Sequence, residues 1–112
     1  MGSDSLFLGI DTSNYTTSVA VVSEDGVVAN IKRLLTVKEG ERGVRQSDAV
    51  FMHTVNLPEL MEAAGEHLAK GKLCAIGVSD KPRNPEGSYM PCFLSGVNAA
   101  TTASICAKSV TL

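Results

Sequence analysis

The stretch LFLGIDTSNYTTSVAVV, residues 6–22, decides how this chain folds. Two apolar runs flank the polar residues Asp11, Thr12, Ser13 and Asn14, and β-branched residues are frequent in the second run, which is typical of strands. The pattern predicts a strand, a polar turn and a returning strand. A carboxylate, hydroxyls and backbone amides would then gather at the tip of this hairpin.

Such a polar tip suits a phosphate group, or a phosphate that carries a metal ion. Amides and hydroxyls can donate hydrogen bonds to phosphate oxygens, whereas the Asp11 carboxylate would repel a bare phosphate unless a cation or an ordered water lies between them. We therefore predict that Asp11, Thr12, Ser13 and Asn14 bind a cofactor. An ordinary hairpin is the alternative, because Asx-turns and ST-turns place the same residue types at turns for structural reasons.

Length and composition indicate one small domain with an aliphatic core. The 112 residues are 44% hydrophobic and 20% charged, with three Phe, two Tyr and no Trp, so Val, Leu, Ile and Ala should fill the core. A net charge of −2 gives no general attraction to nucleic acid. Lys81 and Arg83 form a local basic pair, for which a solvated loop is the simpler explanation.

The cysteines and the amino-terminal residues favour a soluble, cytoplasmic protein. Cys74, Cys92 and Cys106 are odd in number and lack C-x-x-C spacing, so we expect reduced, mostly buried thiols and no zinc site. The residues before Leu6 lack the basic and apolar segments of a secretory signal peptide, and no apolar run is long enough to cross a membrane.

Two further elements follow the hairpin before the middle of the chain. Residues 27–35 come after a Glu-Asp-Gly turn and alternate loosely, as a third antiparallel strand would. Apolar residues then recur at helical spacing from an N-cap at Ser47 or Asp48. Pro58 lies inside this helix and should kink it. His53 falls on the apolar stripe, which favours a core histidine with one satisfied hydrogen bond over a catalytic group.

The last part of the chain predicts a strand, a loop and a second helix. Residues 73–78, LCAIGV, are typical of a strand buried on both faces, and the preceding helix makes it parallel to an earlier strand. Residues 80–91 contain three prolines and form a loop at the carboxyl end of that strand, where open α/β sheets bind ligands. In the helix over 93–110, a stripe of small residues would allow a close approach to the sheet, and consists of Gly96, Ala100, Ala103 and Ala107.

These elements predict an α/β fold with a mixed sheet of three antiparallel strands plus one parallel strand, and two helices. Their order is the first part of the ribonuclease H-like fold that actin-like ATPases, sugar kinases and chaperone ATPases share. The segments LGIDTSNYTTSVAVV, RQSDAVFMHTVNLPELMEAA and AIGVSDKPRNPEGSYMPCFLSGVNAATTASICAKSV together resemble the amino-terminal region of the glycoprotease-like family. That family makes threonylcarbamoyladenosine in tRNA and was once described as O-sialoglycoprotein endopeptidases. The resemblance covers Leu6 to Val110.

The resemblance implies that residues 1–112 form a single domain, the first part of the amino-terminal lobe of an actin-like (ASKHA) protein, with the second lobe absent. It implies ATP and a divalent metal as cofactors of a full-length parent, and tRNA and tRNA-modification subunits as the parent's partners. For the fragment alone it implies no cofactor, no catalytic residue and no metal ligand. His53, Lys81 and Arg83 are expected to lie near the substrate.

The chain departs from the family pattern in three places, one of which is that the last strand of the first sheet and the entire second lobe are missing. Members usually carry G-P-G after the fourth strand, where this chain has Pro85-Glu86-Gly87-Ser88, so this loop is expected to bind differently or not at all. The family's H-x-x-x-H metal pair would lie beyond Leu112. We therefore expect the fragment itself to be inactive.

Two other functions remain open. A non-catalytic scaffold or dimerising partner would explain the altered glycine loop. A metallopeptidase is the third candidate, although no H-E-x-x-H helix, nucleophilic serine elbow or Cys-His pair occurs in the sequence. Because residues 73–78 would be an unpaired sheet edge, we expect a homodimer or higher oligomer, by edge pairing or by exchange of the last helix.

Overall fold

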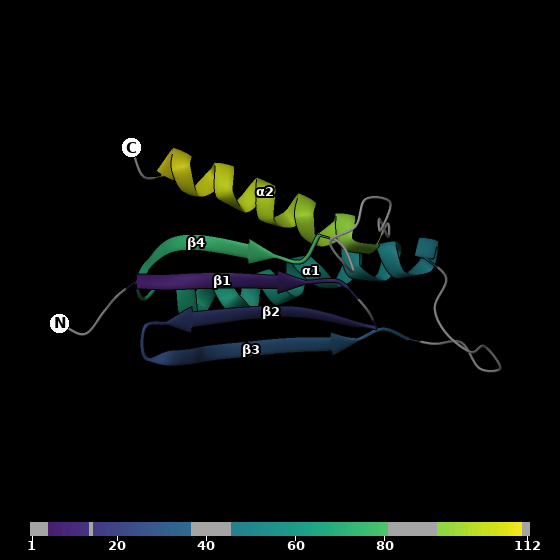
Figure 1. Ribbon diagram of the computed structural model, residues 1–112, viewed down its shortest axis with the longest axis horizontal. Coiled ribbons are helices and arrows are strands. Elements are labelled where there is room, and N and C mark those ends of the chain that lie inside the picture. The colour runs from purple at the N-terminus through teal and green to yellow at the C-terminus, as the bar shows by residue number, and fades with distance from the viewer. Residues whose placement is uncertain (1–4, 14, 37–45, 81–91, 111–112) are drawn as a thin grey trace.

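The computed structural model describes residues 5–13, 15–36, 46–80 and 92–110, without the side chains of 46 and 106–110 (Figure 1). These residues form four strands and two helices, which confirms the predicted α/β fold. The elements in chain order are β1 (Ser5–Asp11), β2 (Thr16–Ser23), β3 (Gly26–Leu34), α1 (Gln46–Leu68), β4 (Lys72–Val78) and α2 (Cys92–Val110).

The four strands form one mixed sheet in the order β3-β2-β1-β4. β1 pairs antiparallel with β2, and β2 pairs antiparallel with β3, whereas β1 and β4 are parallel, as the sequence predicts. Gly26 begins β3 with a φ of 133°, a conformation that favours glycine after the tight turn. The parallel pairing brings the carboxyl ends of β1 and β4 to the same edge of the sheet.

The core lies between one face of the sheet and the two helices. Alternate residues of β1 and β2 point into it, because successive side chains of a strand face opposite ways. The buried hydrophobic residues of this cluster come from both strands and both helices, and are Leu6, Leu8, Ile10, Val19, Val21, Leu57, Leu60, Ala64 and Ala100. The opposite face stays more exposed, and Phe7 on it is 36% exposed.

The prediction that residues 73–78 are buried on both faces is wrong. β4 is an edge strand of a sheet whose core lies on one face, so its residues are at most half-buried. The expectation of mostly buried thiols also fails at Cys74, which is exposed, whereas Cys92 is buried. The register shifts between the pairs Leu6–Leu73 and Phe7–Ala75, so Cys74 is the extra residue of a bulge and has no place in the core.

The helices begin slightly earlier than the sequence suggests. α1 starts at Gln46, so Ser47 and Asp48 lie in its first turn instead of at the N-cap, and the helix continues through Pro58. Asp48 there is favourably placed against the positive end of the helix dipole. Neither described helix is long and apolar enough to cross a membrane.

α2 approaches the sheet closely at Gly96, as its small-residue stripe predicts. A Cβ added there would lie 2.9 Å from Thr12 Oγ1 and 3.3 Å from Val78 Cγ2. Real Cβ atoms essentially never approach another heavy atom as closely as 2.9 Å. Glycine at this position therefore sets the distance between α2 and the strands.

Candidate functional site

The candidate site lies where β1 and β4 end side by side. Asp11 is the last residue of β1, and Ser79 directly follows β4. The Asp11 Oδ1 atom accepts a hydrogen bond from the Ser13 amide at 2.9 Å and another from the Ser79 hydroxyl at 2.7 Å. The Ser79 amide in turn donates to the Ile10 carbonyl at 3.2 Å. The carboxylate is therefore held between two strand ends that are far apart in the sequence.

The surroundings of Asp11 favour its ionised form. Partial burial acts to raise the pKa of this carboxyl, but the hydrogen bonds from Ser13 and Ser79, with the electrostatic influence of His53, outweigh it and lower the pKa below 3.8. Asp11 is thus a fixed negative charge at neutral pH. The contact with the Ser13 amide has the two-residue spacing of an Asx-turn. Asp11 therefore stabilises an ordinary turn and also places a negative charge at the strand end.

Thr12 is fully buried and serves the packing of α2. Its hydroxyl donates to the Cys92 carbonyl at 2.7 Å and accepts from the Gly96 amide at 3.2 Å. These two groups are four residues apart, the spacing that an α-helix pairs within itself. The Thr12 hydroxyl thus bridges a carbonyl and an amide in the first turn of α2. The sequence predicted that this hydroxyl would contact a phosphate instead.

Of the other residues predicted to bind the cofactor, Ser13 is half-buried beside Asp11, and Asn14 lies outside the described residues. Lys81 and Arg83, predicted to lie near the substrate, also lie outside the described residues, as does the segment Pro85-Glu86-Gly87-Ser88. The structure therefore places Asp11, Thr12 and Ser13 together and leaves the basic pair untested.

His53 is fully buried between α1 and β2, as its place on the apolar stripe predicts. Its Nδ1 atom lies 2.6 Å from the Thr17 hydroxyl, which also accepts from Asn56 Nδ2 at 3.2 Å. Whether the Thr17 hydroxyl or the His53 ring donates in this contact depends on the tautomer of the ring. Because His53 is fully buried, it cannot contact a substrate directly in this structure. It can affect the site only indirectly, through its hydrogen bond with Thr17 and its electrostatic effect on Asp11.

A shallow hollow adjoins Asp11 on the open face of the sheet. Its volume is about 340 Å³, and many of the residues that line it are small. The lining residues are Gly9, Ile10, Asp11, Ser18, Ala20, Gly77, Val78 and Ser79. A Cβ added at Gly9 or Gly77 would meet no atom within 4 Å. Among the described residues, no group of three or more His, Cys, Asp or Glu side chains could hold a metal ion.

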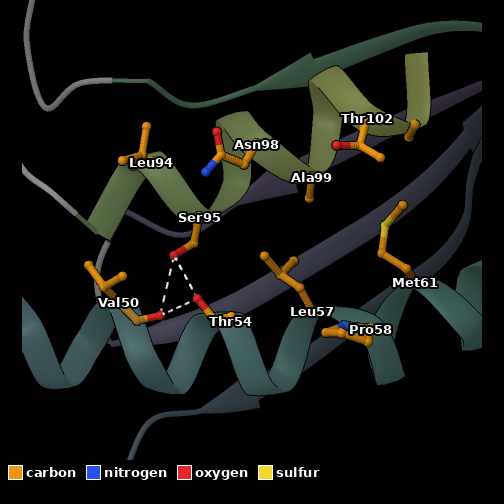
Figure 2. A pocket seen from close by; sticks show the side chains of 11 residues that line it. Val50, Thr54, Leu57, Pro58, Met61, Leu94, Ser95, Asn98, Ala99 and Thr102 are labelled. Carbon is orange, nitrogen blue, oxygen red and sulfur yellow. Dashed lines mark hydrogen bonds between the residues drawn. The ribbon is translucent and has the colours of Figure 1, made fainter. Parts of the chain in front are cut away.

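A second, larger groove of about 450 Å³ lies between α1 and α2 (Figure 2). Two hydroxyls from opposite sides of the groove converge on one carbonyl: Thr54 donates to the Val50 carbonyl at 2.7 Å, and Ser95 donates to it at 3.3 Å. Both hydroxyl protons are therefore used within the protein. Leu57, Met61 and Ala99 line the rest of the groove.

Sequence reasoning missed Ser79, Thr17 and Asn56. Ser79 had a usable signal, because it directly follows the apolar run of β4 at the strand end where ligands bind. Asn56 lies three residues after His53 and so shares its helix face. Nothing local marks Thr17 as the partner of a histidine that is 36 residues away.

Comparisons with known proteins do not identify the chain: no protein-family model matches it, and no curated protein matches it significantly.

Proposed function

We propose that the Asp11 strand tip binds the phosphates of a nucleotide through a divalent cation. In this proposal the chain is the amino-terminal part of a cytoplasmic, ATP- and metal-dependent enzyme that resembles the threonylcarbamoyl transferase family. One observation carries the proposal: the ionised Asp11 carboxylate is fixed by Ser13 and Ser79 at the carboxyl ends of two parallel strands. Ligands of open α/β sheets bind outside these strand ends.

The residues at the tip fit a cation that arrives with its phosphates. Mg²⁺ is usually held by one or two carboxylates together with substrate phosphates and water, not by a cage of protein ligands alone. Asp11 supplies one such carboxylate, and Ser13 and Ser79 fix its position through hydrogen bonds to Oδ1. The cation would neutralise phosphate charge that Asp11 alone would repel.

Other parts of the proposal depend on residues and partners beyond the tip. His53, Lys81 and Arg83 would lie near the substrate, and tRNA with its modification subunits would be the parent's partners. The chain alone would be inactive. Most of the rate acceleration would come from the metal and from the positioning of the reactants. In actin-like enzymes both lobes form the cleft that positions them.

Calorimetric titration tests the proposal. Mg²⁺-ATP, and ATP with a chelator, are titrated into this chain and into a version extended through the second lobe. We expect the extended protein to bind Mg²⁺-ATP, and the Asp11→Asn variant to lose most of the advantage that Mg²⁺ gives. The Glu62→Gln variant is the control, because it removes the same charge from an exposed residue of α1. Equal Mg²⁺ dependence with and without the Asp11 carboxylate would refute the role of the strand tip.

A non-catalytic scaffold is the second candidate. The open face of the sheet and the outer edge of β4, which has no partner strand among the described residues, favour it, because another chain can cover both surfaces. A scaffold predicts that neither protein binds ATP in the same titration. Among the described residues, no cluster favours the metallopeptidase candidate.

A further inference from the structure

Lys32 of β3 lies in the same cross-strand row of the sheet as Asp11. The pairing register places Asp11 opposite Ser18 of β2, and it places Ser18 opposite Lys32. Directly opposed residues of antiparallel strands have Cβ atoms about 4.5–5.5 Å apart. The Cβ atoms of Asp11 and Lys32 are therefore about 10 Å apart, with Ser18 between them.

Lys32 belongs to the open face of the sheet, on which the hollow beside Asp11 lies. Its neighbours in β3 belong to the helix side: Ile31 packs against the core, and Arg33 forms an ion pair with Glu59 of α1. Because successive side chains of a strand point to opposite faces, Lys32 points away from the helices. It is exposed and has no ion-pair partner within the part of the chain that the structure describes.

Ser18 places a hydroxyl group between the two charges. Ser18 and Asp11 both line the hollow of about 340 Å³. No hydrogen bond to another described residue engages the Ser18 hydroxyl. Gly9 and Gly77 line the same hollow without side chains above the sheet. The open face therefore presents a carboxylate, a hydroxyl and an ammonium group in one row, next to free space.

The spacing of this row suits a phosphate that a cation joins to Asp11. Mg²⁺ lies about 2.0–2.1 Å from each ligand oxygen, and an ammonium group lies about 2.7–2.9 Å from a phosphate oxygen. A span of about 10 Å accommodates these contacts in sequence, and the flexible stem of Lys32 can adjust the last of them. The ammonium group also adds a second positive charge, which helps to offset the repulsion between Asp11 and phosphate.

We propose that Lys32 binds the phosphate that the cation carries to Asp11, and that this phosphate lies over Ser18 on the open face of the sheet. The inference rests on the proposed nucleotide function. It adds a second cationic group to that site, and it states which face of the sheet the phosphates occupy.

Amide NMR spectroscopy of the 112-residue chain tests this role, because the method detects weak binding. Mg²⁺ alone, inorganic triphosphate with a chelator, and Mg²⁺-triphosphate are titrated separately. We expect Mg²⁺ alone to shift the amide signals of Ser13 and Ser79, which flank the carboxylate. Mg²⁺-triphosphate should also shift the signals of Ser18 and Lys32, and triphosphate without Mg²⁺ should bind much more weakly.

Three substitutions separate a specific contact from general attraction. Lys32→Gln should raise the dissociation constant of Mg²⁺-triphosphate about fivefold. Lys32→Arg keeps the positive charge and should retain most of the affinity. Lys72→Gln is the matched control, because it removes the same charge from an exposed lysine at the beginning of β4, at the other end of the sheet.

Each contrary result has its own meaning. If Asp11→Asn removes the advantage of Mg²⁺ but Lys32→Gln binds as the wild-type chain does, the role of Lys32 is refuted and the strand tip stands. Equal weakening by Lys32→Gln and Lys72→Gln also refutes it, because only the net charge then matters. If Asp11→Asn has no effect, or if Mg²⁺-triphosphate shifts none of these signals, the proposed function fails together with the inference. The same spectra show whether each variant folds.

Discussion

Replacing Gly96 with alanine tests the close approach of α2 to the sheet. The new Cβ would lie 2.9 Å from Thr12 Oγ1, 3.3 Å from Val78 Cγ2 and 3.4 Å from Ile10 Cγ2. Alanine gains about 1 kcal/mol of helix propensity over glycine. Overpacking typically costs about 1–3 kcal/mol, and displacing Thr12 from its buried hydrogen bonds costs about 1–3 kcal/mol more. We expect the free energy of unfolding to fall by about 1–5 kcal/mol.

Urea unfolding followed by circular dichroism measures this change, and a second glycine provides the matched control. A Cβ added at Gly65 of α1 meets no atom within 4 Å, so Gly65→Ala should stabilise the protein by about 0.5–1 kcal/mol. In a Thr12→Ala background the closest clash disappears, and Gly96→Ala should cost much less than in the wild-type protein. If Gly96→Ala stabilises the chain as Gly65→Ala does, the inferred close packing of α2 is wrong.

Three further predictions concern the polar residues near the site. Thr17→Val leaves His53 Nδ1 and Asn56 Nδ2 without the hydroxyl that contacts both, and should lower the free energy of unfolding by about 1–3 kcal/mol in the same urea assay. Ser79→Ala removes one donor from Asp11, so the pKa of that carboxyl should rise toward 3.8 in an NMR titration. Because the folded-state pKa of Asp11 is lowered, the stability that its charge contributes is fully present above pH 3.8 and is lost as the pH falls through the folded-state value. An Asp11→Asn variant should therefore be less stable than the wild-type protein at neutral pH, and the difference in the free energy of unfolding should shrink in acid.

The sequence predicts the fold well because its signals are local and repetitive. The alternation of apolar residues in β1 and β2 and the helical spacing around His53 each extend over many residues, and all three elements form as expected. The burial of β4 is mispredicted because an apolar run shows that a strand is apolar, not how many faces of its sheet are covered. The order of the elements did predict that this strand lies at the edge of the sheet, as the structure shows, and that prediction already conflicts with burial on both faces.

The site is less predictable because single residues far apart in the chain build it. The sequence identifies Asp11, which the structure places at the strand tip. It does not reveal that Thr12 turns inward, since a hydroxyl in a turn suits solvent, a ligand or a helix equally well. The hydrogen bond from the amide of Gly96, which is 84 residues away in the sequence, shows that the Thr12 hydroxyl contacts a helix. Here the glycine was visible in the sequence as part of a small-residue stripe, but its partner was not.

The contacts between layers suggest why the strand tip has a fixed geometry. Three hydrogen-bonding side chains join neighbouring elements near this end of the sheet: Thr12 links the end of β1 to α2, Thr17 links β2 to α1 through His53, and Ser95 links the two helices to each other. Deeper in the core, the contacts are apolar and less directional. No buried side-chain polar atom among the described residues lacks a hydrogen-bond partner. A satisfied polar layer fixes orientation as well as distance, which is what a carboxylate needs if it is to meet a bound cation without rearrangement.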